Sequence, residues 1–168
     1  DGTTSFTAGT RNGPYAIIGS SRYLDELFDI KGEELIGLQS TDIFTMDELE
    51  LSANSPKEAL EGVEQAIENE VLKYNKIPLM LGGEHSITLG SVRALREKYP
   101  DLSVLQLDAH ADLIDEYVGT KYSHACVMRR IRELGLRVAQ VGIRNVNAEI
   151  KEYFKNQKSK DIFFAPEI

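Results

Sequence analysis

Short, continuous apolar runs alternate with amphipathic stretches along most of the chain. Such runs are typical of strands buried on both faces, and apolar residues that recur every three to four positions indicate helices. Strands are expected at residues 35–44, 77–83, 102–110, 137–144 and 161–168. Helices are expected at residues 15–28, 55–75, 86–99, 124–134 and 148–157, after a Gly-rich loop over residues 1–14. The alternation predicts an α/β fold with three α/β/α layers and a mainly parallel, doubly wound sheet.

The clearest helix signal begins at Ser55. Ser55 is a favourable N-cap residue, and Pro56 suits the first helical position because its missing N–H has no partner there. Glu58, three residues after the cap, completes the pattern of a capping box. A helix that starts at Pro56 is therefore expected.

The chain has 168 residues, of which 42% are hydrophobic and 27% charged. These values are ordinary for one domain, and a domain of this size buries roughly 70% of its unfolded surface. We find no repeat or linker-like segment and expect a single domain over residues 1–168. One cysteine, Cys126, excludes a disulfide framework and favours a cytoplasmic protein. With no base paired to it in the sequence, Cys126 is expected to be a packing residue.

The formal net charge is −8, from 27 acidic and 19 basic residues. This surplus disfavours nucleic acid as a partner and suits a cationic substrate. No run of about 18 apolar residues is present and the first residues lack an apolar signal region, so neither a membrane span nor a signal peptide is predicted.

Candidate metal ligands follow two of the predicted strands. His85 comes after the strand at 77–83, and Asp108, His110 and Asp112 come at the end of the strand at 102–110. The carboxyl ends of parallel strands meet at one edge of a sheet, where ligands bind. In an extended segment, residues i, i+2 and i+4 point to the same side. Two carboxylates directed at one spot repel each other unless a cation lies between them, and this donor set suits Mn, Zn, Fe or Ni, with its carboxylates favouring Mn.

Several nearby polar residues have a simpler interpretation. Glu84 and Asp115 are expected to be solvated or to cap helices, and Ser123 is a better cap for the helix at 124–134 than His124 is. Any one of the candidate ligands taken alone also fits a cap or a hydrogen-bonded polar group. It is their combination after two strands that favours a metal site. Glycine-rich phosphate loops, the GxSxG motif and CxxC are absent from the sequence.

Three motifs in this order, GGEHS, DAHAD and SHACVMRR, resemble the ureohydrolase family of arginases and agmatinases. QVGIR and the opening segment are also similar to that family, with Ala8-Gly9 where Pro-Gly is common. The resemblance implies an arginase-like fold and the hydrolysis of a guanidinium group to urea and an amine. It also implies two Mn²⁺ ions that share a hydroxide, and a homo-oligomer, either a trimer or a hexamer.

The resemblance also suggests a role for each residue. His85 and Asp112 resemble ligands of one manganese, His110 resembles a ligand of the other, and Asp108 looks like a carboxylate that bridges the two. His124 resembles the histidine that moves protons near the substrate.

The substrate is expected to be a small cationic guanidino compound, with agmatine, cleaved to putrescine and urea, as the first choice. Asn145 and Asn147 stand where arginases carry aspartates that bind the amino-acid end of their substrate, and SHACVMRR looks more like agmatinases. The alternatives are an arginase, a guanidinobutyrase or a formiminoglutamase. A deacetylase-like relative has no motif support.

One departure from the family matters. Its members have a later Asp-x-Asp-x-x-Asp-Pro motif that supplies two more metal ligands, and these 168 residues contain none. Because this later motif is missing, we expect a domain that is truncated at its C-terminal side. The start at Asp1, with no methionine, also suggests a partial domain. One metal would then keep three protein ligands and the other two, and an inactive metal-binding fragment is the alternative to an enzyme.

Overall fold

The structure is a computed structural model that describes residues 2–22, 43–157 and 161–167. Its helices and strands follow one another in the order that the apolar pattern predicts. The longest of these helices has 15 residues, and no helix in the described ranges is both long and apolar enough to cross a bilayer. The main elements are α1 (Gly13–Ser21), α2 (Pro56–Glu70), α3 (Thr88–Lys98), β1 (Ser103–Leu107), α4 (Val127–Glu133), β2 (Arg137–Ile143), α5 (Ala148–Gln157) and β3 (Ile162–Phe164).

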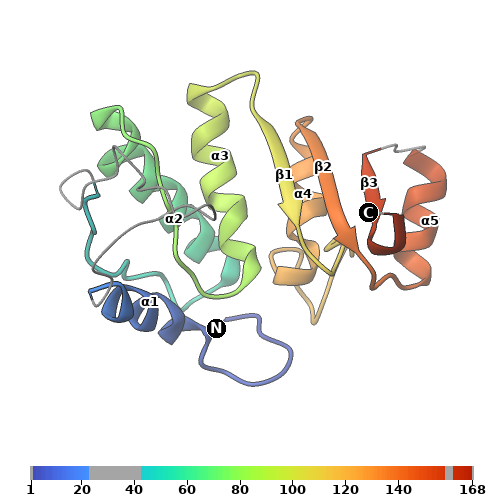
Figure 1. Cartoon of the computed structure of the whole chain (residues 1–168), viewed down its shortest axis with the longest axis horizontal. Helices are drawn as coiled ribbons and strands as arrows, with labels where there is room; N and C mark the ends of the chain where they lie inside the picture. Colours follow the sequence, from blue (N-terminus) through green and yellow to red (C-terminus); the bar gives the residue numbers. More distant parts are fainter. Residues whose placement is uncertain (1, 23–42, 158–160, 168) are drawn as a thin grey trace, which may run out of the picture.

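Strands β1, β2 and β3 form a parallel sheet in that order. Helix α4 connects β1 to β2, and α5 connects β2 to β3 (Figure 1). The register places Gln106 beside Gln140, and Gln140 beside Ile162. The predicted α/β class and the parallel sheet are therefore confirmed, and all three strands end at the same edge.

One face of this sheet carries the main core. Val104, Val138 and Ile162 pack on this face against apolar side chains of α4 and α5. On the opposite face, Leu105 and Leu107 are exposed. Within the described ranges, helices thus cover one face of the sheet, because two successive crossovers in the same direction place both helices on the same side.

Helix α2 begins as its sequence predicts. Pro56 occupies the first turn, and the Ser55 hydroxyl accepts a hydrogen bond from the Glu58 backbone N–H at 3.2 Å. The Glu58 carboxylate accepts hydrogen bonds from Ser52 at 2.8 Å and from Asn54 at 3.0 Å. These hydrogen bonds lower the pKa of Glu58. The N-terminal cap of α2 therefore includes Ser52 and Asn54 as well as the Ser55–Glu58 pair.

Two predicted elements differ in the structure. Residues 77–83 were expected to form a buried strand, but they pair with no strand of the described ranges, and Ile77 and Leu79 are exposed. That prediction is wrong here, because a strand forms only where a segment hydrogen-bonds to a neighbouring strand, and residues 77–83 do not pair with the outer edge of β1. The loop expected up to Pro14 already turns helical at Thr10, since proline favours the first turn of a helix.

Two further predictions fall partly outside the described residues. The strand expected at 35–44 lies there except for Ile43 and Phe44, which belong to no strand. The helix expected at 15–28 is present as far as Ser21, and residues 23–28 are outside the described ranges.

Candidate metal centre

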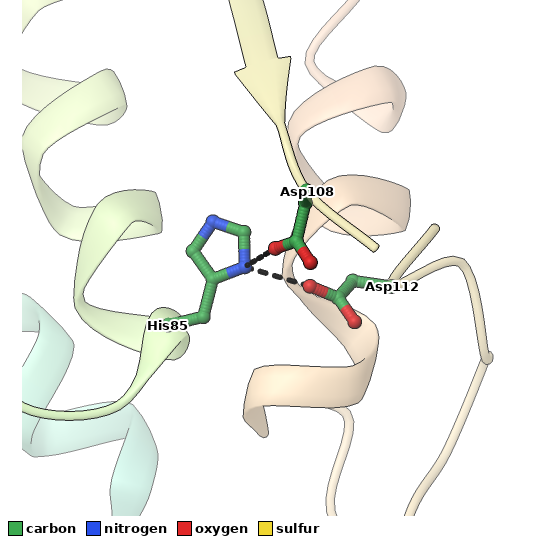
Figure 2. Close-up of side chains that lie close together, drawn as sticks. All are labelled: His85, Asp108 and Asp112. Atoms are coloured by element: carbon green, nitrogen blue, oxygen red, sulfur yellow. Dashed lines mark hydrogen bonds and ion pairs between the residues drawn. The ribbon is translucent and has the colours of Figure 1, made fainter. Parts of the chain in front are cut away.

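His85, Asp108 and Asp112 come together at the carboxyl edge of the sheet (Figure 2). One nitrogen or oxygen atom from each residue lies within 4.8 Å of the others. The His85 Nδ1 atom is 2.6 Å from Asp112 Oδ2 and 3.7 Å from Asp108 Oδ2. An imidazole and two carboxylates at these separations form a donor set that fits a divalent cation.

The position of His85 is fixed by a tight turn and a cap. Gly83 has a φ of 64°, a left-handed conformation that glycine adopts without steric cost. The Glu84 carboxylate then accepts hydrogen bonds from the Ser86 hydroxyl and, at 2.9 Å, from the Ser86 backbone N–H. Glu84 thereby caps the 3₁₀ turn His85–Ile87, which confirms the capping role expected for it.

Asp112 has an unusual backbone conformation for a residue other than glycine. Its φ is 50°, and its carbonyl oxygen accepts hydrogen bonds from the N–H groups of Met128 at 3.0 Å and Arg129 at 3.2 Å. The first turn of α4 therefore holds the Asp112 backbone in the left-handed region. Backbone strain of this kind persists only where the surroundings enforce it, and it is common at functional sites.

This conformation changes the expected geometry of Asp108-x-His110-x-Asp112. The segment leaves the extended conformation after β1, so simple alternation does not bring all three side chains to one point. His110 lies outside the group formed by His85 and the two aspartates, and 60% of its side chain is exposed. His110, which pairs with Asn145 in an isolated bridge, does not join the two aspartates, so the expectation that all three side chains converge on one point is wrong in this detail.

Asp108 stands between the two histidines. Its Oδ2 atom faces His85, and its Oδ1 atom lies 3.5 Å from His110 Nδ1. Oδ1 also accepts a hydrogen bond from the His110 backbone N–H at 2.9 Å. The carboxylate thus presents one oxygen to each histidine, a geometry compatible with a bridging ligand.

The surroundings of His85 favour positive charge. Burial lowers the pKa of His85, but the hydrogen bond with Asp112 and the negative charges of Asp112, Asp108 and Glu84 outweigh burial, and the pKa lies above its ordinary value. The electrostatic field that retains a proton on this imidazole also attracts a cation.

A cavity of about 580 Å³ opens over these side chains. Its volume is in the range of small-molecule sites. Its lining includes the predicted site residues His85, Asp108, His110, Asp112, His124, Asn145 and Asn147. Thr4, Ser5, Phe6 and Thr7 of the N-terminal segment complete one wall. All the residues selected from the sequence therefore meet at one cavity.

His124 lies at the start of the 3₁₀ turn that leads into α4. Its Nδ1 atom is 3.4 Å from the Thr3 hydroxyl, which also accepts a hydrogen bond from the His124 backbone N–H at 3.2 Å. The Tyr117 ring packs edge-on against the imidazole, with 5.5 Å between ring centroids. The N-terminal segment and Tyr117 thus position a histidine that lines the cavity.

The two asparagines have different environments. Asn145 pairs with His110 in an isolated parallel bridge, and its backbone N–H donates to Ala109 at 3.0 Å. The Asn147 side-chain oxygen accepts a hydrogen bond from the Ile150 backbone N–H at 2.9 Å, as an N-cap of α5 does. In these contacts the Asn147 side chain serves as a helix cap, whereas Asn145 takes part through its backbone.

Asp115 anchors the segment that follows Asp112. Its carboxylate is 2.6 Å from Arg130 Nη2 and also faces Arg129 and Lys121. Its backbone N–H donates to Glu149 at 2.8 Å. The hydrogen bond from Arg130 holds the pKa of Asp115 below its usual value. These contacts tie the loop after the candidate metal site to α4 and α5.

Sequence reasoning missed two buried residues below the site, Gln106 and Gln140. Their signal is present in the sequence, because each is a polar residue inside an apolar strand, where an unpaired amide is costly. Reasoning from the sequence also missed Thr3, although it lies in the opening segment that resembles the family, and Tyr117, which no motif distinguishes.

The fold and the site define an α/β protein with a candidate divalent-metal centre at the carboxyl edge of a parallel sheet. A family model described as "Arginase family" matches residues 1–168. The chain belongs to this family, in agreement with the resemblance of its motifs.

Individual relatives give a finer comparison. The chain is 37% identical over 159 residues to an N(1)-aminopropylagmatine ureohydrolase of Thermococcus kodakarensis, covering 94% of this chain and 52% of the relative. It is 36% identical over 152 residues to an agmatinase of Pyrococcus horikoshii, covering 89% of this chain and 50% of the relative. The crystal structure of an agmatine ureohydrolase of Thermoplasma volcanium has a TM-score of 0.75 and 33% identity, over 98% of this chain and 53% of that one. The chain spans about half the length of these relatives.

Proposed function

We propose that this chain carries the metal centre of a ureohydrolase that cleaves agmatine to putrescine and urea. The observation that carries the proposal is the group His85, Asp108 and Asp112 at the base of a cavity of small-molecule size. Membership of the Arginase family and similarity to proteins named agmatinase support it.

In this proposal the residues of the site take part in holding two Mn²⁺ ions. His85 and Asp112 would hold one ion, His110 would hold the other, and Asp108 would bind both. When bound, the metal pair supplies an acidified water as the nucleophile. Further ligands for the pair are expected from outside these 168 residues.

The residues of this chain bind the substrate and move the proton. In the proposed reaction, water adds to the guanidinium carbon, the bond from that carbon to the alkyl nitrogen breaks, and urea and an alkylammonium ion form. His124 lines the same cavity, and an imidazole there can pass a proton to the departing amine. The contacts of His124 with Thr3 and Tyr117 would keep its ring directed at the cavity.

The cavity rim favours a substrate without an amino-acid end. Asn145 and Asn147 are neutral where arginases are expected to carry aspartates, and the Asn147 oxygen is already used as a helix cap. In the described part of the chain, Asn145 and Asn147 offer no charge partner for the α-ammonium group of arginine. Agmatine lacks the α-carboxylate and meets this rim at lower desolvation cost.

Urea release from matched substrates tests the proposal. The natural full-length chain, loaded with Mn²⁺, would be assayed with agmatine, arginine, 4-guanidinobutyrate and formiminoglutamate. We expect the highest kcat/KM with agmatine. A higher value with another of these compounds would replace agmatine as the substrate, and no hydrolysis of any of them would refute the ureohydrolase assignment.

Two other expectations belong with this proposal. We propose that the protein acts in the cytoplasm and assembles as a trimer or hexamer. Light scattering of the purified natural protein measures the assembly, and a monomer would contradict it.

A further inference from the structure

We infer that Gln106 and Gln140 form a directional hydrogen-bond relay that positions the two carboxylates of the metal centre. The two residues are neighbours in the register of β1 and β2, and their side chains are 6% and 0% exposed. The inference rests on the proposed metal centre, and it assigns a positioning role to residues that do not reach the metal themselves.

The orientation of the Gln140 amide is fixed by partners that each have only one role. Arg132 only donates, and its Nε and Nη2 atoms lie 3.3 Å and 3.2 Å from Gln140 Oε1. The Ala111 carbonyl only accepts, and it receives a hydrogen bond from Gln140 Nε2 at 2.7 Å. The amide oxygen must therefore face Arg132, and the amide nitrogen must face the interior.

This orientation determines that of Gln106. Gln140 Nε2 donates its second hydrogen to Gln106 Oε1. The Gln106 amide nitrogen is thereby turned toward acceptors only: the His110 carbonyl at 3.1 Å, Asp108 Oδ2 at 3.3 Å and Asp112 Oδ2 at 3.5 Å. The donors run in one direction, from the Arg132 guanidinium to the two aspartates.

The charges at the two ends favour the same direction. Arg132 places a positive charge at the start of the relay, and the candidate ligands place two negative charges at its end. Hydrogen bonds in series polarise one another in a buried environment, so each amide N–H becomes a better donor to the carboxylates. The relay thus offsets part of the repulsion between Asp108 and Asp112 and holds the Oδ2 atom of each toward the same point.

The relay also connects the sheet to the loop that carries the ligands. Gln140 binds the Ala111 carbonyl and Gln106 binds the His110 carbonyl, so both hydrogen-bond to the backbone between the aspartates. This backbone lies beyond the end of β1, where the regular ladder has ended and an isolated bridge pairs His110 with Asn145. Partners of metal ligands act in this way, and their loss typically weakens metal binding or activity by about 10- to 100-fold.

The test compares variants that keep side-chain volume and remove the amide. Gln106→Met and Gln140→Met would be made in the natural full-length chain, with Gln65→Met on the exposed surface of α2 as the matched control. Mn²⁺ affinity would be measured by calorimetric titration, and thermal unfolding would be followed without metal. We expect both buried variants to bind Mn²⁺ about 10- to 100-fold more weakly and the control to bind it as the parent does.

The readouts separate positioning from stability. A variant that unfolds at a lower temperature but binds Mn²⁺ with the parent's affinity would overturn the relay, since the glutamines would then only stabilise the core. If neither Gln106→Met nor Gln140→Met folds, the Arg132→Met variant tests the relay instead. Arg132 is only half-buried, so its replacement disturbs the core less. Weaker Mn²⁺ binding by Arg132→Met supports the relay, and unchanged binding overturns it.

The same titration distinguishes this inference from the proposed function. A parent protein that binds Mn²⁺ but releases urea from no guanidino compound refutes the function and leaves the relay to be decided by the variants. A parent that hydrolyses agmatine while the variants bind Mn²⁺ normally refutes the relay alone. A parent that binds no Mn²⁺ refutes both.

Discussion

The Nδ1 atom of His85 lies 2.6 Å from the Oδ2 atom of Asp112, although the two residues are 27 positions apart in the chain. His85 stands on the turn before α3, and Asp112 stands beyond β1, at the first turn of α4. The contact joins two loops that α3 and β1 separate in sequence. It depends on the packing of α3 against α4, whose apolar side chains share the main core.

Replacing Asp112 by asparagine tests the candidate metal centre. Asp112→Asn keeps the shape of the side chain but removes the negative charge nearest to His85. We expect Mn²⁺ affinity to fall by at least about 100-fold. Loss of a residue that only supports a metal ligand costs about 10- to 100-fold, so loss of a ligand itself should cost at least the upper end of that range. Calorimetric titration of the natural full-length protein measures this.

Asp101→Asn is the matched control for that change. Asp101 is exposed in the turn after α3 and lies away from the cavity lining. We expect its variant to bind Mn²⁺ as the parent does. Equal affinities for both variants would show that Asp112 is no ligand.

Replacing His124 separates proton transfer from metal binding. His124→Asn retains a polar side chain beside Thr3 but has no group that titrates near neutral pH. We expect kcat for urea release to fall about 10²- to 10⁴-fold, the usual contribution of general acid–base catalysis, with Mn²⁺ content unchanged. A variant that retains full kcat, or that loses its manganese, would contradict the catalytic role.

Asp115 gives a prediction about pH. Its pKa is lowered from the ordinary value of 3.8, chiefly by the Arg130 hydrogen bond. A carboxyl whose folded pKa is depressed stabilises the protein above its unfolded pKa, and this contribution is lost as the pH falls through the folded pKa. We expect Asp115→Asn to lower the free energy of unfolding by about 1 kcal/mol at pH 7, as for a partly exposed ion pair.

The difference in free energy of unfolding between the parent and Asp115→Asn should stay constant from pH 7 to about pH 5 and shrink toward zero below pH 3.8. Urea unfolding at several pH values measures this difference. Glu116→Gln is the control, since Glu116 is exposed and is in no ion pair within the described part of the chain. A difference that grows on acidification would refute the Arg130 interaction.

Gly90 tests the close contact of α2 and α3. A Cβ atom at Gly90 would lie 2.6 Å from the Leu60 carbonyl oxygen and 2.9 Å from Val63 Cβ. We expect Gly90→Ala to destabilise the protein by about 1–3 kcal/mol through overpacking. Gly19→Ala in α1, where nothing lies within 4 Å, should instead be neutral or stabilise slightly, and thermal melts compare the two. Equal shifts in melting temperature for the two variants would show that α2 and α3 can move apart without loss of stability.

Much of the fold was readable from local patterns. Helix α5 has the bounds expected from its amphipathic period, and the Ser55 cap of α2 depends on residues within one turn. Strand β2 follows from a short apolar run. The segment at 77–83 shows the limit, because its apolar run is as clear as that of β2, yet a strand also needs a neighbouring edge that local sequence does not specify.

The sequence by itself predicted that seven of the cavity-lining residues would lie together, because motifs at the ends of parallel strands meet at one edge of the sheet. Only the tertiary structure decided how they are arranged there. Asp112, in a left-handed turn that α4 holds through hydrogen bonds, lies with His85 and Asp108, whereas His110 lies outside that group and faces the other oxygen of Asp108. The Gln140–Gln106 relay likewise depends on the register of two strands. Both features come from contacts between segments far apart in the chain, and a periodicity of two or 3.6 residues carries no information about such contacts.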